Sequence, residues 1–440
     1  MSRIFHVRFL IILFVLGCQP IVNNNSRGTV TPISNNDVTE TQVIPISKPG
    51  STITPEIVFN KISTTSGLEA KLSSQCLDVT DAPPASNSLI VLRSLKNYVP
   101  RQAPDIILID MSEERPRETI QKINITSNFS VSSNRESIAY MASTFNDGEV
   151  TDVDLIIANG NFQIQNTFPW DDKWSSILGW TTDQKIIILL TPDAIPKPPV
   201  SYVLVDPLNG RQETIYLGIP DFLDKSLYDL PYWNGWYGLL INPTLEFAVY
   251  PRPSNANKEM HTYALWDISS NKTVLSLENI FSAFSSFNTF PMPYWTTDGT
   301  QFSFVSHKED TSSLAKFELF LVRREGNIDQ LTNLSDIAYV QPSFQSWSPD
   351  NSLIAFFLTP SGLNYANVAI VSTNNHDVID LCLSINFQEP PPIWSPNGKQ
   401  FLVVDKYEEG HKRVLLVDVE KNIVYPVAND AEPIGWMVKP

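Results

Sequence analysis

The stretch that decides the fold reads Trp347-Ser-Pro-Asp-Asn-Ser-Leu-Ile-Ala-Phe-Phe357. It consists of a large apolar residue, a tight polar turn and an apolar strand. Near-copies of this pattern begin at Trp394, Trp295 and Trp180, and two shorter copies begin at Val131 and Ile241. Repeats that return after about 40 to 60 residues indicate stacked supersecondary units, each too small to bury its own apolar face.

Each repeat continues into two more predicted strands. A third strand ends at an aspartate, as at Asp206, Asp267 and Asp418, and a turn rich in Asn and Gly leads to a fourth strand. Four antiparallel strands per unit is the composition of a propeller blade. The 33 prolines and the 11% aromatic content of the 440-residue chain also favour a turn-rich, all-β protein. We therefore predict a β-propeller of four-stranded blades.

The number of blades follows from the two ends of the repeat series. The last copy, at Trp436, has no strands after it, and the predicted strands 88–93, 105–110 and 118–123 have no repeat start before them. Together they would complete one blade, which predicts seven blades with the C-terminal strand closing the ring. The alternative is six blades, with residues 56–123 forming a separate cap.

The repeat resembles that of the TolB-type, WD-repeat-like propeller family, whose units read Trp-Ser-Pro-Asp-Gly followed by an apolar strand. The match is specific at Trp347–Asp350 and at Trp394–Pro396 with Gly398, and it covers about residues 88–438. It is weak at Val131 and Ile241, where the Trp is missing. The resemblance implies a propeller used for protein contacts, and it carries over no catalytic residue.

The N-terminal residues 1–18 have the pattern of an export signal. Two basic residues precede the apolar run that starts at Phe9, and Val15-Leu-Gly-Cys18 resembles the lipobox of bacterial lipoproteins. The run is too short for a spanning helix. The resemblance implies cleavage and lipid attachment at Cys18, and thus a chain anchored on the outer side of the bacterial cytoplasmic membrane or in the outer membrane. The alternative is an ordinary secretory signal.

Residues 19–55 are rich in Asn, Thr, Ser and Pro and contain almost no aromatic side chains. Such a composition buries too little apolar surface to offset the entropy of ordering, which predicts a disordered tether. From residue 56 the composition becomes globular. We therefore expect three parts: a signal peptide (1–18), a tether (19–55) and a propeller domain (56–440).

The net charge of −16 makes nucleic acid an improbable partner, because an acidic surface repels phosphates. The chain contains no nucleophile elbow, no zinc-protease motif, no phosphate loop and no dinucleotide fingerprint. The four histidines after residue 18 lie in separate repeats without ligand spacing. We predict no catalytic residue, no cofactor and no metal site.

The acidic and amide residues of the repeats allow two interpretations. A ring of metal ligands is one; the other is that they shape the turns, where Asp and Asn bond the local backbone and Gly accepts a positive φ. We favour turns. The residues concerned are Asp183, Asp298, Asp350, Asn134 and Asn397.

Cys76 and Cys382 are the two cysteines that remain beside Cys18. In an exported protein they permit a disulfide that would pin the segment before the first blade to a later outer strand. Two buried free thiols are the alternative.

The segments between an outer strand and the next inner strand are long and aromatic. Such connections lie on one face of a propeller, where repeat proteins place binding sites. Mixed aromatics and carboxylates suit peptides, sugars or cations; capping of the blades is the alternative role. The candidate binding residues are Trp170, Trp174, Tyr232, Trp233, Phe287 and Tyr339. We expect a non-enzymatic scaffold for a protein, peptide or glycan; an exported glycan enzyme and a propeller accessory to a peptidase are the alternatives.

Overall fold

The computed structural model shows an all-β protein whose described residues form strands and no helix. None of the described residues forms a helix that could span a membrane. All strands belong to the compact unit Thr54–Pro440. The structure describes residues 58–63, 69–82, 84, 88–96, 105–112, 117–122, 129–146, 149–170, 175–190, 201–216, 240–253, 261–270, 272–282, 294–306, 317–324, 328–334, 337–340, 345–361, 363, 365–385, 390–408 and 411–439. The predicted signal peptide, Cys18 and the predicted tether lie outside these residues.

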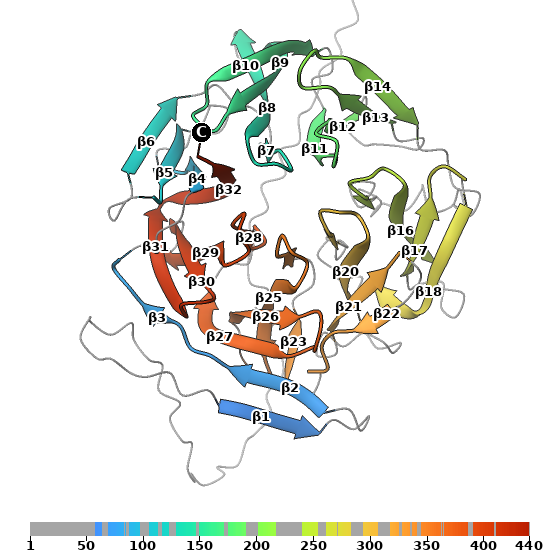
Figure 1. Ribbon diagram of the computed structural model, residues 1–440, viewed down its shortest axis with the longest axis vertical. Coiled ribbons are helices and arrows are strands. Elements are labelled where there is room, and N and C mark those ends of the chain that lie inside the picture. Colours follow the sequence, from blue (N-terminus) through green and yellow to red (C-terminus); the bar gives the residue numbers. More distant parts are fainter. Residues whose placement is uncertain are drawn as a thin grey trace, which may run out of the picture. The chain divides into compact units, whose positions relative to one another are not determined.

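The strands pair into seven sheets that follow one another around a ring, as Figure 1 shows. We number these sheets as blades 1 to 7 and give each from its inner to its outer strand. Blade 1 contains β32 (Ala431–Val438), β4 (Ser88–Ser94), β5 (Asp105–Asp110) and β6 (Arg117–Lys122). Blade 2 contains β7 (Ser130–Val131), β8 (Ser137–Asn146), β9 (Glu149–Asn159) and β10 (Ile164–Trp170). Blade 3 contains β11 (Ser176–Trp180), β12 (Ile186–Leu190), β13 (Ser201–Val205) and β14 (Gln212–Tyr216).

The remaining four blades repeat this order. Blade 4 contains β15 (Leu240–Ile241), β16 (Phe247–Pro253), β17 (His261–Asp267) and β18 (Lys272–Ser282). Blade 5 contains β19 (Tyr294–Trp295), β20 (Gln301–Ser306), β21 (Glu318–Arg323) and β22 (Ile328–Gln330). Blade 6 contains β24 (Ser346–Trp347), β25 (Leu353–Pro360), β26 (Ala366–Ser372) and β27 (Val378–Ile385), with β23 (Ala338–Val340) also paired to β25. Blade 7 contains β28 (Ile393–Trp394), β29 (Gln400–Glu408), β30 (His411–Asp418) and β31 (Ile423–Asn429).

The ring is closed by the pairing of β32 with β4, as predicted from Trp436. The two strands run antiparallel from the pair Ala431–Ser94 to the pair Val438–Ser88. Glu432 of β32 forms ion pairs with Arg93 of blade 1 and Lys412 of blade 7. Burial alone would raise the pKa of Glu432, but these two cations outweigh it and hold the pKa below its ordinary value. The strands β4, β5 and β6 are therefore part of a closed blade.

The apolar core consists of layers between neighbouring blades. One layer joins blades 5 and 6, with Phe356 and Leu319 fully buried, and another joins blades 7 and 1 around Trp436. The second and third strands lie inside these layers on both faces, which explains continuous apolar runs such as the buried run of β25. The outer strand β10 alternates exposed and half-buried residues, because only one of its faces is covered.

Three strands precede blade 1 and lie outside the ring. These are β1 (Val58–Ser63), β2 (Glu69–Ser74) and β3 (Asp78–Val79). β1 and β2 form a hairpin, β2 pairs in parallel with the outer strand β27 of blade 6, and β3 pairs in parallel with the outer strand β31 of blade 7. We call residues 69–80 the strap, because they cross the outer edges of two blades (Figure 1).

Candidate functional site

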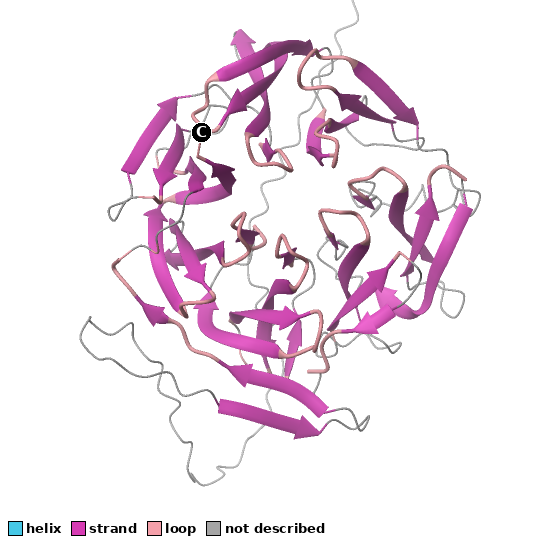
Figure 2. Cartoon of the chain, in the orientation of Figure 1, coloured by secondary structure: helices cyan, strands magenta, loops and turns pink. Residues whose placement is uncertain are grey.

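The repeat turn, which joins the inner strand of a blade to its second strand, has one hydrogen-bond pattern throughout. In the turn 348–352, Ser348 Oγ donates to Asp350 Oδ1 (2.6 Å) and accepts from Leu353 N (2.9 Å). The amide of the fourth residue, Asn351, donates to the Ser348 carbonyl (2.9 Å). The same bonds occur in the turns 132–136, 296–300 and 395–399. In the turn 181–185, which closes one residue earlier, Thr181 Oγ1 accepts from Lys185 N, and in 242–246 the side chain of Asn242 replaces the hydroxyl. Figure 2 shows these turns near the middle of the ring.

The acidic residues of these turns therefore bond their own backbone and neighbouring hydroxyls. Hydrogen bonds lower the pKa of Asp183, and the main contribution comes from Thr181. Burial alone would raise the pKa of Asp350, but Ser348 and Ser352 outweigh it. Among the residues that the structure describes, no three His, Cys, Asp or Glu side chains are grouped so as to hold a metal ion. The turn interpretation accounts for these residues.

The lowered pKa of Asp350 predicts a dependence of stability on pH. A carboxylate whose folded pKa lies below the ordinary value of 3.8 stabilises the fold above that pH, and this contribution is lost as the pH falls through the folded pKa. Asp350→Asn should keep the turn, because Asn397 occupies the same position in blade 7. We expect a change of less than about 0.5 kcal/mol at pH 7 and a smaller loss of stability below pH 4. An unchanged acid unfolding curve would contradict this.

The repeat tryptophans connect each blade to the one before it. The indole nitrogen of Trp180 donates to the carbonyl of Ser130 in blade 2 (3.0 Å), and that of Trp394 donates to Ser346 in blade 6 (3.1 Å). The rings also contact the second strand of their own blade, as in the Trp394–Phe401 pair at 4.9 Å between centroids. These tryptophans serve the packing of the ring.

Arg135 connects blade 2 to blades 1 and 7. Blade 1 has no repeat turn, because its inner strand β32 and its second strand β4 are far apart in the chain. Arg135 lies in the repeat turn of blade 2 and spans the gap that the missing turn leaves. Its guanidinium donates to the carbonyl of Trp394 in blade 7 (2.8 Å), and its own carbonyl accepts from the amide of Val438 in blade 1 (2.9 Å). Burial lowers the pKa of Arg135 to about 10, so the side chain stays charged at neutral pH.

Arg135 and Gln184 occupy the same turn position, with φ of 61° and 64°, where two other turns have Gly299 and Gly398. Glycine relieves about 1 kcal/mol of strain at such a position. Gln184→Gly should therefore leave stability unchanged or raise it slightly. Arg135→Gly should lower stability by about 1 kcal/mol, because the loss of a hydrogen bond from a charged donor outweighs that gain. Chemical denaturation of both variants is the measurement, and equal effects would contradict the bridging role.

The predicted binding residues are only partly within the described chain. Trp170 ends β10, is 6% exposed and packs with Ile177 and Trp180 between blades 2 and 3. Its assignment to a binding face was wrong, because its ring belongs to the core. Tyr339 lies in β23, opposite Thr359 of β25. Trp174, Tyr232, Trp233 and Phe287 lie outside the described residues.

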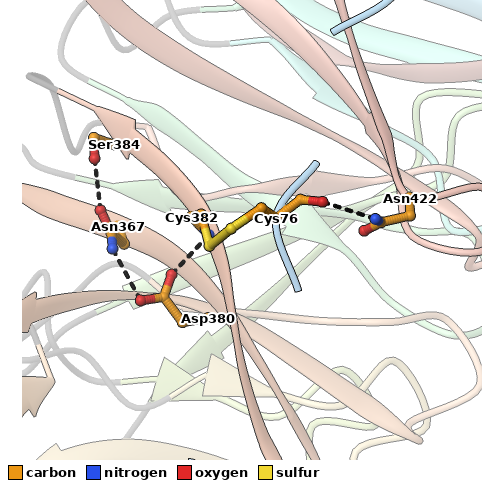
Figure 3. Close-up of a disulfide and its surroundings, with 6 residues drawn as sticks. All are labelled: Cys76, Asn367, Asp380, Cys382, Ser384 and Asn422. Atoms are coloured by element: carbon orange, nitrogen blue, oxygen red, sulfur yellow. Dashed lines mark hydrogen bonds between the residues drawn. A yellow bond between two sulfur atoms is a disulfide. The ribbon is translucent and has the colours of Figure 1, made fainter. Parts of the chain in front are cut away.

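The cysteines Cys76 and Cys382 form a disulfide, with their Cα atoms 4.7 Å apart (Figure 3). Cys76 lies in the strap between β2 and β3, where its carbonyl accepts from Asn422 Nδ2 of blade 7 (2.8 Å). Cys382 lies at a bulge of β27 with φ of 52°, and its amide donates to Asp380 Oδ1 (2.8 Å). Burial raises the pKa of Asp380, against hydrogen bonds from Asn367 and Cys382. The disulfide thus joins the strap covalently to blade 6, beside its polar contact with blade 7.

Sequence reasoning identified the cysteine pair but not Arg135. The signal for Arg135 was a charged residue at the turn position that glycine occupies elsewhere. That signal does not reveal the partner, which is 259 residues away.

No protein-family model matches the chain, and no curated protein matches it. Three solved structures illustrate how far the fold of this chain resembles that of known proteins. An oligogalacturonate lyase in complex with manganese has a TM-score of 0.46 at 10% identity and covers 78% of this chain and 86% of its own. The β-propeller domain of the Trilobed protease from Pyrococcus furiosus has a TM-score of 0.41 at 11% identity and covers 82% and 96%. A putative TolB from Agrobacterium tumefaciens has a TM-score of 0.35 at 14% identity and covers 61% and 84%.

At these identities the likeness concerns the fold alone. The assignment to the propeller class rests on the strand pairing of the chain itself, in which seven sheets follow one another and the last strand closes the first blade. The protein is a β-propeller scaffold.

Proposed function

We propose that this chain is an exported, lipid-anchored protein whose propeller binds a protein, peptide or glycan of the cell envelope without catalysing a reaction. The observation that carries the proposal is the Cys76–Cys382 disulfide together with the strap that contains it. Disulfides persist in exported proteins and are rare in the reducing cytosol. The bond therefore agrees with an export signal at residues 1–18.

The strap also has a position suited to an anchored protein. It lies between the predicted tether and blade 1 in sequence, and it pairs with the outer edges of blades 6 and 7. A force applied through a tether held by Cys18 would act first on the pairing of the strap with blades 6 and 7 and on the disulfide. Only then would it act on the closing pair β32–β4. The binding role itself rests on the aromatic segments predicted between the blades, with Trp174, Tyr232, Trp233 and Phe287 as the residues to test.

Lipid attachment is tested by replacing Cys18 with serine in the producing bacterium. We expect the natural chain in the detergent-soluble membrane fraction, with an N-terminal mass that includes diacylglycerol on Cys18, and the Cys18→Ser variant outside that fraction. Multiple acyl chains give stable membrane attachment, so the shift should be nearly complete. Equal fractionation of the two forms, with an unmodified N-terminus, would contradict lipid anchoring and leave an ordinary secretory signal.

Binding is tested with the same exported chain on a glycan array and against envelope proteins. The variant combines Trp174→Ala, Tyr232→Ala and Trp233→Ala. The matched control is Leu208→Ala, because Leu208 is 82% exposed in a turn at the opposite end of blade 3. A specific ligand should be captured by the natural chain and the control and lost by the triple variant while its unfolding transition is kept. Equal capture by the triple variant would exclude this face.

A further inference from the structure

A surface pocket with a volume of about 490 Å³, half open to solvent, lies between blades 1 and 2; we call it the cavity. This volume falls within the range of small-molecule sites in proteins, roughly 300 to 1,000 Å³. The cavity is placed where β5 ends and where β9 turns into β10. Since strands alternate in direction, this is the end of the blades that carries the repeat turns. The predicted aromatic segments start from the opposite end, where β10 ends, so the cavity is distinct from the face proposed above.

The floor of the cavity is apolar and is shaped by an unusual turn. Leu89 and Leu108 of blade 1 and Phe162 of blade 2 are all buried. Phe162 has a φ of 57°, a conformation that costs a non-glycine residue about 1 kcal/mol or more, and the equivalent turn of blade 3 has Gly210 at 72°. The turn is held by Asn159, whose Oδ1 accepts from the amides of residues 161 and 163 (both 3.0 Å). The strained turn directs the Phe162 ring into the space between the blades.

The rim of the cavity is polar, and most of its residues are exposed. Thr119, Asn161 and Gln163 are exposed, so their polar groups can bond water or a ligand. Gln163 accepts from Asn159 Nδ2 (3.1 Å) and keeps its own amide donors. The Asp110 carboxylate, 17% exposed, accepts from Ser112 and is paired with Lys439 Nζ (2.7 Å). The rim therefore offers a carboxylate, a hydroxyl and two amides above an apolar floor.

This set of groups selects for a neutral ligand. Burial alone would raise the pKa of Asp110, but Lys439 and Ser112 outweigh it, so the group is ionised at neutral pH. Because Asp110 is paired with Lys439, the two groups together carry no net charge and offer no uncompensated charge to an ionic ligand. A cationic ligand would have to displace the ammonium group that already pairs with this carboxylate. Ser112 and Lys439 occupy three of the roughly four lone pairs of this carboxylate, so a ligand hydroxyl can still donate to it.

The geometry points to a binding site for a neutral sugar residue in the cavity between blades 1 and 2. Ring hydroxyls would donate to Asp110 and bond Thr119, Asn161 and Gln163, while the apolar face of the ring would lie on the floor. The site is independent of the lipid anchor and of the aromatic segments, so it stands or falls separately from the proposed function.

The test uses the purified full-length chain and ligand-observed saturation-transfer NMR. The probes are glucose and N-acetylglucosamine as neutral sugars, glucuronate as an acid and glucosamine as a cation. Thr119→Trp fills the cavity from an exposed position. The matched control is Thr214→Trp, since Thr214 is exposed and pairs with Val203 in blade 3 as Thr119 pairs with Leu108 in blade 1. Thermal unfolding checks that both variants are folded.

We expect saturation transfer to at least one neutral sugar in the natural chain and in Thr214→Trp, and binding at least about tenfold weaker in Thr119→Trp. Gln163→Ala provides a second variant that removes one rim group without filling space and should weaken binding several-fold. The proposal is overturned if neither neutral sugar binds, if Thr119→Trp binds as well as its control, or if the charged sugars bind better than the neutral ones.

Discussion

Replacing Trp436 with alanine should destabilise the propeller by about 3 to 5 kcal/mol, the cost of removing a buried tryptophan. Trp436 is 1% exposed in the layer between blades 7 and 1, and its indole nitrogen donates to the Ile393 carbonyl of blade 7 (2.8 Å). The change therefore weakens the only blade whose strands come from both ends of the described chain. Chemical denaturation followed by tryptophan fluorescence measures the loss.

Trp180→Ala is the matched control, because Trp180 makes the same bond to blade 2 within a blade of continuous sequence. Both variants should lose stability, but only Trp436→Ala should detach a strand without unfolding its blade. In hydrogen exchange we expect the amides of β32 and β4 to lose protection in Trp436→Ala while those of β12 and β13 keep it. Uniform loss of protection across the ring, or protection of β32 equal to that of the natural chain, would contradict a separable closing strand.

Breaking the Cys76–Cys382 bond should cost about 2 to 4 kcal/mol, because the bond links residues 306 positions apart and restricts the unfolded chain. Both cysteines are exposed, so a reductant can reach the bond without unfolding the blades. We expect reduction, or Cys76→Ser with Cys382→Ser, to expose the strap to exchange and proteolysis. Without the disulfide, the strand pairing between the strap and the blades is short: three residue pairs join β2 to β27, and two join β3 to β31.

The ring itself should survive the loss of this bond, since none of its seven inner strands depends on the strap. Reductant added to the double serine variant should have no further effect, which separates the disulfide from side effects of the reagent. Intact protection of β2 and β3 after reduction would show that the parallel pairs suffice. Collapse of the whole propeller would show that the strap is part of the cooperative unit.

The positions of the inner strands could be predicted because the turn chemistry is local. Val131 and Ile241 lack the tryptophan, yet the Ser132 and Asn242 turns after them keep the same hydrogen bonds, so both repeats were located. The closing role of Trp436 followed from counting strands. The strap was not predicted as strands, because its sequence is mixed and polar, and because it pairs with β1 and with blade edges more than 300 residues away.

The candidate sites were predicted less well than the fold. Trp170 has the composition of a binding-loop residue, but the neighbouring blade covers it, and burial of this kind depends on the packing of two blades. The cavity between blades 1 and 2 was not predicted either, since it joins Asp110 to Phe162 across a blade boundary. The left-handed conformations of Phe162 and Arg135 arise from local turns, but the contacts that their side chains make across a blade boundary could not be predicted.

The disulfide also constrains the chemistry of the third cysteine. The chain has three cysteines, which allow three different pairs during oxidative folding, and only Cys76 with Cys382 matches the folded strap. A free Cys18 thiolate could attack the bond and exchange with either sulfur, because both cysteines are exposed residues. Conversion of Cys18 to a thioether would remove that nucleophile. On the proposed lipidation, the acyl anchor thus protects the correct sulfur pairing as well as holding the protein at the membrane.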